Sequence, residues 1–336
     1  MASRKDNASA TTPSRSRLGN LAGHARPLLA LAVAVVCLAD VASWIEAQGG
    51  TIERDRTGRV TGVNLRAGWI TDTDLARLSG LPHLTQLNLS LTHISDIGME
   101  RLAPLAGVVE LDLAYAEHIT DEGLAHLKGW RKLERLTLRG TKITDTAIEH
   151  LAAITSLRAL DVSFTQITNN GLDRLSALRS LSELAIGGNK ITDAGLQFLK
   201  LMPDLTKLDL HGRQRTDSGL WSASLTDEGL DAIGTLVHLR NLNLAGTKIT
   251  DRGVAKLGAL TALESLDLSG TQVSSKGIEE LEKLPKLKKL VLWKARRIDD
   301  SAVTQLNAMR RLDYLDVGET GISAEAKEQL VAAHVR

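Results

Sequence analysis

The chain has 336 residues, of which 43% are hydrophobic and 3% aromatic, and its formal net charge is +1. This composition supplies a large aliphatic core without the strong basic excess of nucleic-acid-binding domains, so nucleic acid is not expected as a partner. The single cysteine, Cys37, excludes a disulfide framework and a thiolate metal site.

The N-terminal region is basic and polar. Residues 1–27 carry five basic groups against one acidic group, a net charge of +4, and show no apolar period, which predicts disorder. Residues 28–47 follow as a largely apolar segment, in which every residue from Leu28 to Ala39 is apolar. A basic flank before an apolar run is typical of a segment that directs a chain to a membrane.

Three interpretations of residues 28–47 stay open. An uncleaved membrane anchor is favoured by the long N-terminal region and by Asp40. A cleaved signal is the second, although the sites after Ser43 and Ala47 have bulky residues two positions earlier. A buried helix on the end of the following domain is the third. By the basic-residue rule, residues 1–27 stay cytoplasmic and the rest lies outside, either anchored or secreted or periplasmic after cleavage.

Residues 48–336 are predicted to form one repeat domain with both ends covered. Two strand-like segments, 51–55 and 59–65, flank Arg56, Thr57 and Gly58 and predict an N-terminal hairpin. The segment 322–335 begins with the cap-like Ser323 and predicts a helix that closes the other end.

Between these ends, the motif I-T-D-x-G-L recurs about every 24 residues, most clearly in 143–166 and 249–272. An L-x-L segment such as 136–138 alternates with period two and predicts a short strand with one buried face. A G-L-x-x-L-x-x-L segment such as 253–260 suits a helix or helical turn. The copies begin at Ile70, Ile94, Ile119, Ile143, Ile167, Ile191, Leu225, Ile249, Val273 and Ile298.

Two polar residues stand just before the helical segment of each repeat and are expected to be helix N-caps, and the second of them forms a column through the array. Such side chains accept hydrogen bonds from backbone N–H groups at helix N-termini, so helix capping is preferred to calcium binding. The column comprises Asp72, Asp96, Asp121, Asp145, Asn169, Asp193, Asp227, Asp251, Ser275 and Asp300.

The repeated unit resembles the leucine-rich-repeat family, in particular the I-T-D-x-G-L subtype of ribonuclease-inhibitor-like and F-box-associated proteins. Many bacterial proteins of this subtype carry Thr where eukaryotic ones carry Cys or Asn. The resemblance covers about residues 50–330 and implies a curved α/β solenoid, with a parallel sheet on the concave face, helices on the convex face and a binding function. The threonines are Thr92, Thr141, Thr165, Thr247, Thr271 and Thr320.

The strand positions that point away from the core predict a polar concave face. The column between the two strand leucines is mainly acidic, and the column before it mixes charges, so a protein or peptide with basic groups would fit. Alternatively, Asp and Asn merely tolerate a solvated strand. The candidate binding residues are Asp112, Arg135, Asp161, Lys207, Asp209, His211, Asn243 and Asp267.

The sixth repeat is interrupted. Its motif and the next are 34 residues apart instead of 24, and the extra segment 213–224 contains another T-D-x-G-L at 216–220. A partial duplication that forms a loop after the strand is predicted. Arg213, Arg215 and Trp221 are candidate binding residues, because arginine and tryptophan are enriched at binding hot spots. The alternative is an accidental duplication with Trp221 packed on the helices.

No constellation points to catalysis or to a cofactor. The repeat register pairs His93 with His118 and His126 with His150, but no carboxylate or cysteine is placed to complete a metal site, so solvated surface histidines are expected. Nucleophile-elbow, zinc-protease, phosphate-loop and dinucleotide motifs do not occur in the sequence. The chain is therefore predicted not to be an enzyme.

The hypothesis that follows is a protein- or peptide-binding repeat module that is membrane-anchored or exported. A structural repeat protein is the alternative. An adaptor for ubiquitin ligation is disfavoured, because residues 1–48 contain no helical F-box.

Overall fold

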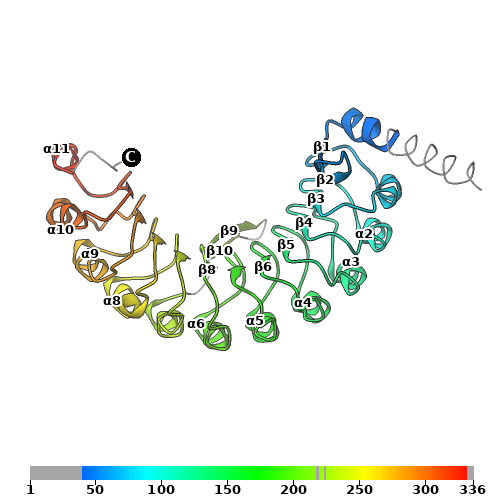
Figure 1. Cartoon of the computed structure of the whole chain (residues 1–336). Helices are drawn as coiled ribbons and strands as arrows, with labels where there is room; N and C mark the ends of the chain where they lie inside the picture. Colours follow the sequence, from blue (N-terminus) through cyan, green and yellow to red (C-terminus); the bar gives the residue numbers. More distant parts are fainter. Residues whose placement is uncertain (1–39, 217–218, 223–224, 331–336) are drawn as a thin grey trace, which may run out of the picture.

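A computed structural model describes residues 40–216, 219–222 and 225–330. The repeats form an open arc, with strands along the inner, concave side and helices along the outer, convex side (Figure 1). The curved α/β solenoid expected from the repeats is thus confirmed.

The concave side is one sheet of twelve described strands, in which only the first pair, β1 and β2, is antiparallel. In each three-residue strand the central leucine, such as Leu111, is buried and its two neighbours face outward, because side chains alternate along a strand. The strands are β1 (Thr51–Arg54), β2 (Val60–Asn64), β3 (Gln86–Asn88), β4 (Glu110–Asp112), β5 (Arg135–Thr137), β6 (Ala159–Asp161), β7 (Glu183–Ala185), β8 (Lys207–Asp209), β11 (Asn241–Asn243), β12 (Ser265–Asp267), β13 (Lys289–Val291) and β14 (Tyr314–Asp316).

The convex side is built from short helical segments, some of them α-helical and some 3₁₀. Leucines spaced by three, such as Leu257 and Leu260, are buried toward the strands. The segments are η1 (Asp74–Gly80), α2 (Asp96–Leu102), α3 (Asp121–Leu124), η2 (Ala125–Leu127), α4 (Asp145–Leu151), α5 (Asn169–Leu175), α6 (Asp193–Leu196), η3 (Gln197–Leu201), η4 (Asp227–Gly229), α7 (Leu230–Ile233), α8 (Asp251–Ala255), η5 (Lys256–Ala259), α9 (Ser275–Leu281), η6 (Asp300–Ala302), α10 (Val303–Ala308) and α11 (Ala324–Lys327).

One continuous aliphatic core runs between the two layers. In five repeats a buried threonine closes the core below the turn that follows the strand. The hydroxyl of Thr141, for example, donates to the carbonyl oxygen of Leu138 at 2.7 Å, and Thr92, Thr165, Thr247 and Thr271 make the same bond. A buried hydroxyl is thereby satisfied without another side chain.

Both ends are covered in the described part of the chain. The predicted hairpin is confirmed: β1 pairs with β2, and the Asp55 carboxylate accepts hydrogen bonds from the N–H groups of Thr57 and Arg59 in the turn. At the other end Ser323 caps α11, which is shorter than the predicted 322–335 helix. Residues 331–335 of that prediction lie outside the described residues.

The predicted apolar segment 28–47 divides at residue 40. Residues 40–47 are helical, with Ile45 buried and Val41 and Trp44 packed against the first repeats. Residues 40–47 thus form a helix that packs on the end of the repeat domain, as the third of the three interpretations expected for the segment 28–47. Residues 28–39, like residues 1–27, lie outside the described part. Among the described helices, none has both the length and the apolar composition needed to cross a bilayer.

The prediction that the aspartate column caps the helices is wrong. In most repeats the cap is the preceding Ser or Thr: the hydroxyl of Thr120, for example, accepts a hydrogen bond from the N–H of Glu122, whereas η6 is capped by Asp299. The aspartate is instead the first helical residue and binds the next repeat. The Asp96 carboxylate accepts the backbone N–H of Thr120 at 2.8 Å and its hydroxyl at 2.6 Å. Sequence reasoning placed the cap one position late, because Thr and Asp are both good capping residues.

The same bridge recurs from repeat to repeat and explains the glycine of the motif. A Cβ on Gly98 would lie 2.5 Å from Oδ1 of Asp72, and one on Gly277 would lie 2.6 Å from Oδ1 of Asp251. The glycine therefore makes room for the carboxylate of the preceding repeat. The further bridges join Asp72 to Ser95, Asp121 to Thr144, Asp145 to Thr168, Asn169 to Thr192, Asp193 to Thr226, Asp227 to Thr250, Asp251 to Ser274 and Asp300 to Ser323.

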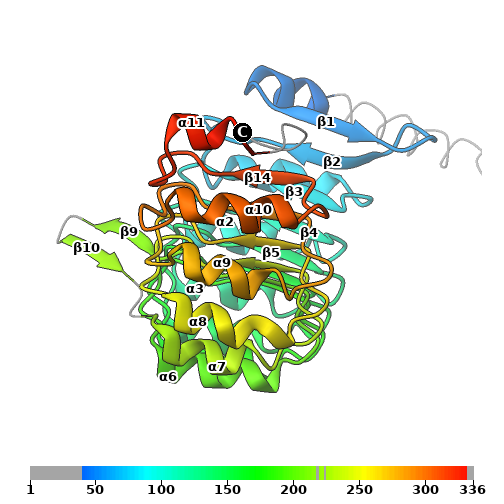
Figure 2. The ribbon, with the colours of Figure 1, turned by 90° about the vertical axis from the view of Figure 1, so that its left-hand side faces the viewer.

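The extra segment of the sixth repeat is not a plain loop. Its strands β9 (Arg213–Thr216) and β10 (Gly219–Ser222) pair antiparallel and project from the side of the solenoid (Figure 2). The register of the main sheet continues past it, with Lys207 of β8 opposite Asn241 of β11. A hairpin satisfies its own backbone groups, so it is accommodated without displacing a repeat.

Candidate functional site

The acidic column of the concave face has a structural role that the sequence did not reveal. The Oδ1 atom of Asp112 accepts the backbone N–H of Ala114 at 2.9 Å and thereby ends the strand in a tight turn. Asp161, Asp209, Asn243 and Asp267 accept the N–H two residues ahead in the same way. The second polar atoms of Asp209 and Asn243 bond to each other at 3.1 Å.

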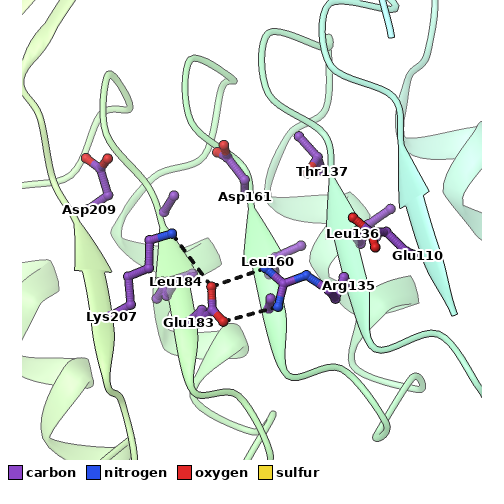
Figure 3. Close-up of a pocket in the computed structure, with 12 residues that line it drawn as sticks. Glu110, Arg135, Leu136, Thr137, Leu160, Asp161, Glu183, Leu184, Lys207 and Asp209 are labelled. Atoms are coloured by element: carbon purple, nitrogen blue, oxygen red, sulfur yellow. Dashed lines mark hydrogen bonds and ion pairs between the residues drawn. The ribbon is translucent and has the colours of Figure 1, made fainter. Parts of the chain in front are cut away.

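An ion-pair network crosses the middle of the concave face (Figure 3). Arg135 donates to both carboxylate oxygens of Glu183, at 3.1 and 3.3 Å, and the Lys207 ammonium lies 3.7 Å from the same carboxylate. Arg135 and Glu183 are two strands apart, and the small side chain of Ala159 lies between them in the register. A shallow hollow of about 220 Å³ surrounds the network.

The network holds its acid in the charged form. The hydrogen bond from Arg135 lowers the pKa of Glu183, and burial, which acts in the opposite direction, does not cancel it. Glu183 thus carries a full negative charge between two cations, so the hollow presents alternating charges.

A second cluster is centred on Asp209 and His211. The Nδ1 atom of His211 lies 2.6 Å from Oδ1 of Asp209, and the Asn243 amide donates to the other oxygen at 3.1 Å. Burial favours the neutral carboxyl, but the hydrogen bonds and charge of His211 outweigh it and lower the pKa of Asp209. Asp209 is therefore a partly buried anion held by three neighbouring groups.

Arg139 and Phe164 extend this cluster toward the N-terminal repeats. The Arg139 guanidinium lies 4.4 Å from the centre of the Phe164 ring, 3.8 Å from Asp161 and 3.4 Å from Nε2 of His211. The rings of Phe164 and His211 are 4.9 Å apart. Three different repeats thus contribute to one partly exposed cluster of an aromatic ring, an imidazole and charged groups.

The turn after most strands of the main sheet contains a backbone position with positive φ. Gly140, Gly188, Gly246 and Gly270 occupy it in four repeats, whereas others place larger residues there. Leu91, Tyr115 and Phe164 adopt φ values of 58°, 57° and 57°, which strain any residue with a Cβ and most of all bulky ones. Such strain is concentrated where a side chain has a task other than stability.

Comparison with known proteins agrees with this architecture. A family model described as Leucine Rich repeat matches residues 80–103, 153–176, 177–200, 235–258 and 259–281. The chain is a leucine-rich-repeat protein.

Solved structures resemble the chain. An internalin (inlF) from Listeria monocytogenes superposes on 78% of this chain and 69% of its own, with a TM-score of 0.59 and 24% sequence identity. An internalin C2 (inlC2) from the same organism covers 69% of this chain and 80% of its own, with a TM-score of 0.43 and 22% identity. No curated protein matches the chain. At this identity the likeness to the first internalin concerns the solenoid alone.

The leucine-rich-repeat solenoid brings some of the predicted binding residues together and leaves others apart. Asp209, His211 and Asn243 are in contact, and Arg135 and Lys207 share one acid. Asp112 and Asp267 bond within their own turns. Arg213, Arg215 and Trp221 lie in the strands of the hairpin, and their side chains are outside the described part of the structure.

The predicted histidine pair 93 and 118 lies in a row of rings at the edge of the solenoid. The rings of His93 and His118 are 6.1 Å apart, and Trp69, which is 86% exposed, lies 6.1 Å from His93. Among the residues that the structure describes, no group of three His, Cys, Asp or Glu side chains is placed to hold a metal ion.

Sequence reasoning missed three contributors to the clusters: Arg139, Phe164 and Glu183. For Phe164 a signal existed, because a bulky residue stands in a column where other repeats have glycine. Glu183 and Arg139 gave no such signal, because Arg135 lies 48 residues before Glu183 and His211 lies 72 residues after Arg139.

Proposed function

We propose that this leucine-rich-repeat protein is a non-enzymatic module that binds a segment of another protein on its concave face. The contact would centre on Arg139, Phe164, Asp209 and His211, with the Arg135, Glu183 and Lys207 network beside it. The observation that carries the proposal is Phe164, a bulky residue kept at a φ of 57° to place its ring between Arg139 and His211.

Charge and position both support this site. Arginine, aromatic and histidine groups that are partly exposed and already ordered lose little freedom on binding. The hairpin begins directly after His211 and Gly212, so Arg213, Arg215 and Trp221 belong to the same region of the surface. We therefore include the hairpin in the proposed contact area.

Site-specific photo-cross-linking on the full-length chain tests the proposal. A photoreactive residue in place of Lys207 is expected to capture a distinct partner in the native cells, and the same residue in place of the exposed Lys276 on α9 serves as the convex-face control. The additional change Phe164→Ala should abolish the Lys207 cross-link. Equal capture from both positions, or capture that survives Phe164→Ala, would contradict the proposed site.

We also propose that residues 28–39 direct the repeats to a membrane or out of the cytoplasm. The buried Ile45 limits where a signal could be cleaved. Cleavage after Ala47 would remove this core side chain, whereas cleavage after Ser43 would keep it. Intact-mass measurement of the membrane and soluble fractions should find a mature chain that retains Ile45. A mature chain that begins at residue 48 would refute this constraint.

A further inference from the structure

A groove lies in the turns beyond the hairpin, between His211 and Trp293, and has a volume of about 540 Å³. Its floor is the backbone of Gly212, Gly246 and Gly270 in three successive repeats. The N–H groups of these glycines donate to carbonyl oxygens of the adjacent repeats at 2.7 to 2.8 Å. These donors are already bonded and glycine has no side chain, so at these three positions the groove presents mainly Cα surface.

Elsewhere in the same row of turns, large side chains cover the glycines of neighbouring repeats. The Phe164 ring lies over Gly188, where a Cβ would be 2.7 Å from its Cδ1 atom, and Trp293 lies over Gly318, where a Cβ would be 2.9 Å from its Cδ1 atom. At Gly270, by contrast, a Cβ would have no described atom within 4 Å. Within the described part of the chain, the groove therefore has no covering ring over Gly270.

The rim of the groove at its Trp293 end is cationic. Lys294 stacks on the Trp293 ring at 3.8 Å and lies 3.6 Å from Glu319. Arg296 and Arg297 also line the groove and are exposed, and neither has an ion pair with a described residue. Two exposed guanidinium groups suit carboxylates, which they bind through paired hydrogen bonds.

We propose that this groove binds an aromatic side chain of an acidic protein segment. The ring lies over Gly270 beside Trp293, as Phe164 lies over Gly188, and neighbouring carboxylates pair with Arg296 and Arg297. The inference rests on the proposed function as a protein-binding module and names the chemistry of the bound segment.

The test uses the full-length protein and a fluorescein-labelled peptide with one phenylalanine between pairs of glutamates. Fluorescence anisotropy should show saturable binding that weakens at least about tenfold when the phenylalanine is replaced by alanine, as expected for loss of an aromatic anchor. A peptide with lysines in place of the glutamates should bind no better than the alanine peptide.

Two variants locate the site. Gly246→Phe supplies the missing ring from the preceding repeat, as Phe164 covers Gly188 in the repeat after it, and should weaken peptide binding at least about tenfold. Gly258→Phe, in open space on the convex side, is the matched control. The double change Arg296→Glu and Arg297→Glu should weaken binding similarly, whereas Lys276→Glu on α9 should not.

The proposal is overturned if the wild-type protein binds the phenylalanine and alanine peptides equally, or if Gly246→Phe, shown to be folded by circular dichroism, binds as the wild type does. Tighter binding of a polyanionic oligosaccharide without aromatic rings would also overturn it. A partner captured from Lys207, together with peptide binding that ignores the phenylalanine, would refute the groove while leaving the concave-face function standing.

Discussion

Asp96 binds Thr120 of the next repeat through two hydrogen bonds, one to its backbone N–H and one to its hydroxyl. The same hydroxyl caps α3, so one contact joins the stacking of two repeats to the start of a helix. Because a solenoid is held together only by contacts between neighbouring repeats, such bridges are decisive for its cooperativity.

Replacing Asp96 by alanine should destabilise the chain. Two charge-assisted hydrogen bonds are lost and the Thr120 N–H is left without its partner, so we expect a loss of about 2 kcal/mol in the free energy of unfolding. Urea denaturation measures it. Glu100→Ala, on the exposed side of the same helix, is the control and should change stability by less than about 0.5 kcal/mol. Equal effects of the two changes would show that the bridge is energetically unimportant.

Asp209 should make stability depend on acidic pH. Its pKa is lower in the folded chain than in the unfolded chain, where it is about 3.9. Its contribution is therefore complete above the unfolded value and is lost as the pH falls through the lower folded value. The stability advantage of the wild type over Asp209→Asn should thus shrink between about pH 6 and about pH 3, as measured by urea unfolding. An advantage that is the same at both pH values would contradict the role given to His211.

The variant Leu91→Gly should be more stable than the variant Leu91→Ala. Its φ of 58° strains any residue that has a Cβ, and its side chain is 41% exposed. Both changes remove the same exposed side chain, but only glycine relieves the backbone. We expect Leu91→Gly to be more stable than Leu91→Ala by about 1 kcal/mol, since strain relief exceeds the extra entropy of glycine in the unfolded chain. Thermal unfolding of the pair decides it, and a more stable alanine variant would show that this turn is unstrained.

Regular features were predictable because they depend on local periodicity. The L-x-L segments became strands, and their outward columns are in the predicted register, including Lys207 beside Asn241 across the insertion. The hairpin before the first repeat was predicted from its turn residues. These features follow from the alternation of side chains and from turn chemistry, both of which act within a few residues.

The clusters were less predictable because they join residues far apart in the chain. Arg135 and Lys207 were singled out, but their shared partner Glu183 was not. The aspartate column was given the wrong partner, because a Thr-Asp pair before a helix does not reveal which residue caps it. The stacking of repeats determines which residue is the cap, because it places the aspartate carboxylate against the backbone N–H and the hydroxyl of the Thr in the next repeat.

The sequence by itself determined the solenoid, its strand register and the exposed columns of its concave face, because the repeat makes every unit bury the same leucines. Tertiary structure decided that the concave-face carboxylates end strands and that the motif aspartates join neighbouring repeats. It also decided which side chains of the turns come into contact. Repeats that lie far apart in sequence stack within contact distance, and only then do Phe164, His211 and Arg139 meet, while Gly270 is left uncovered.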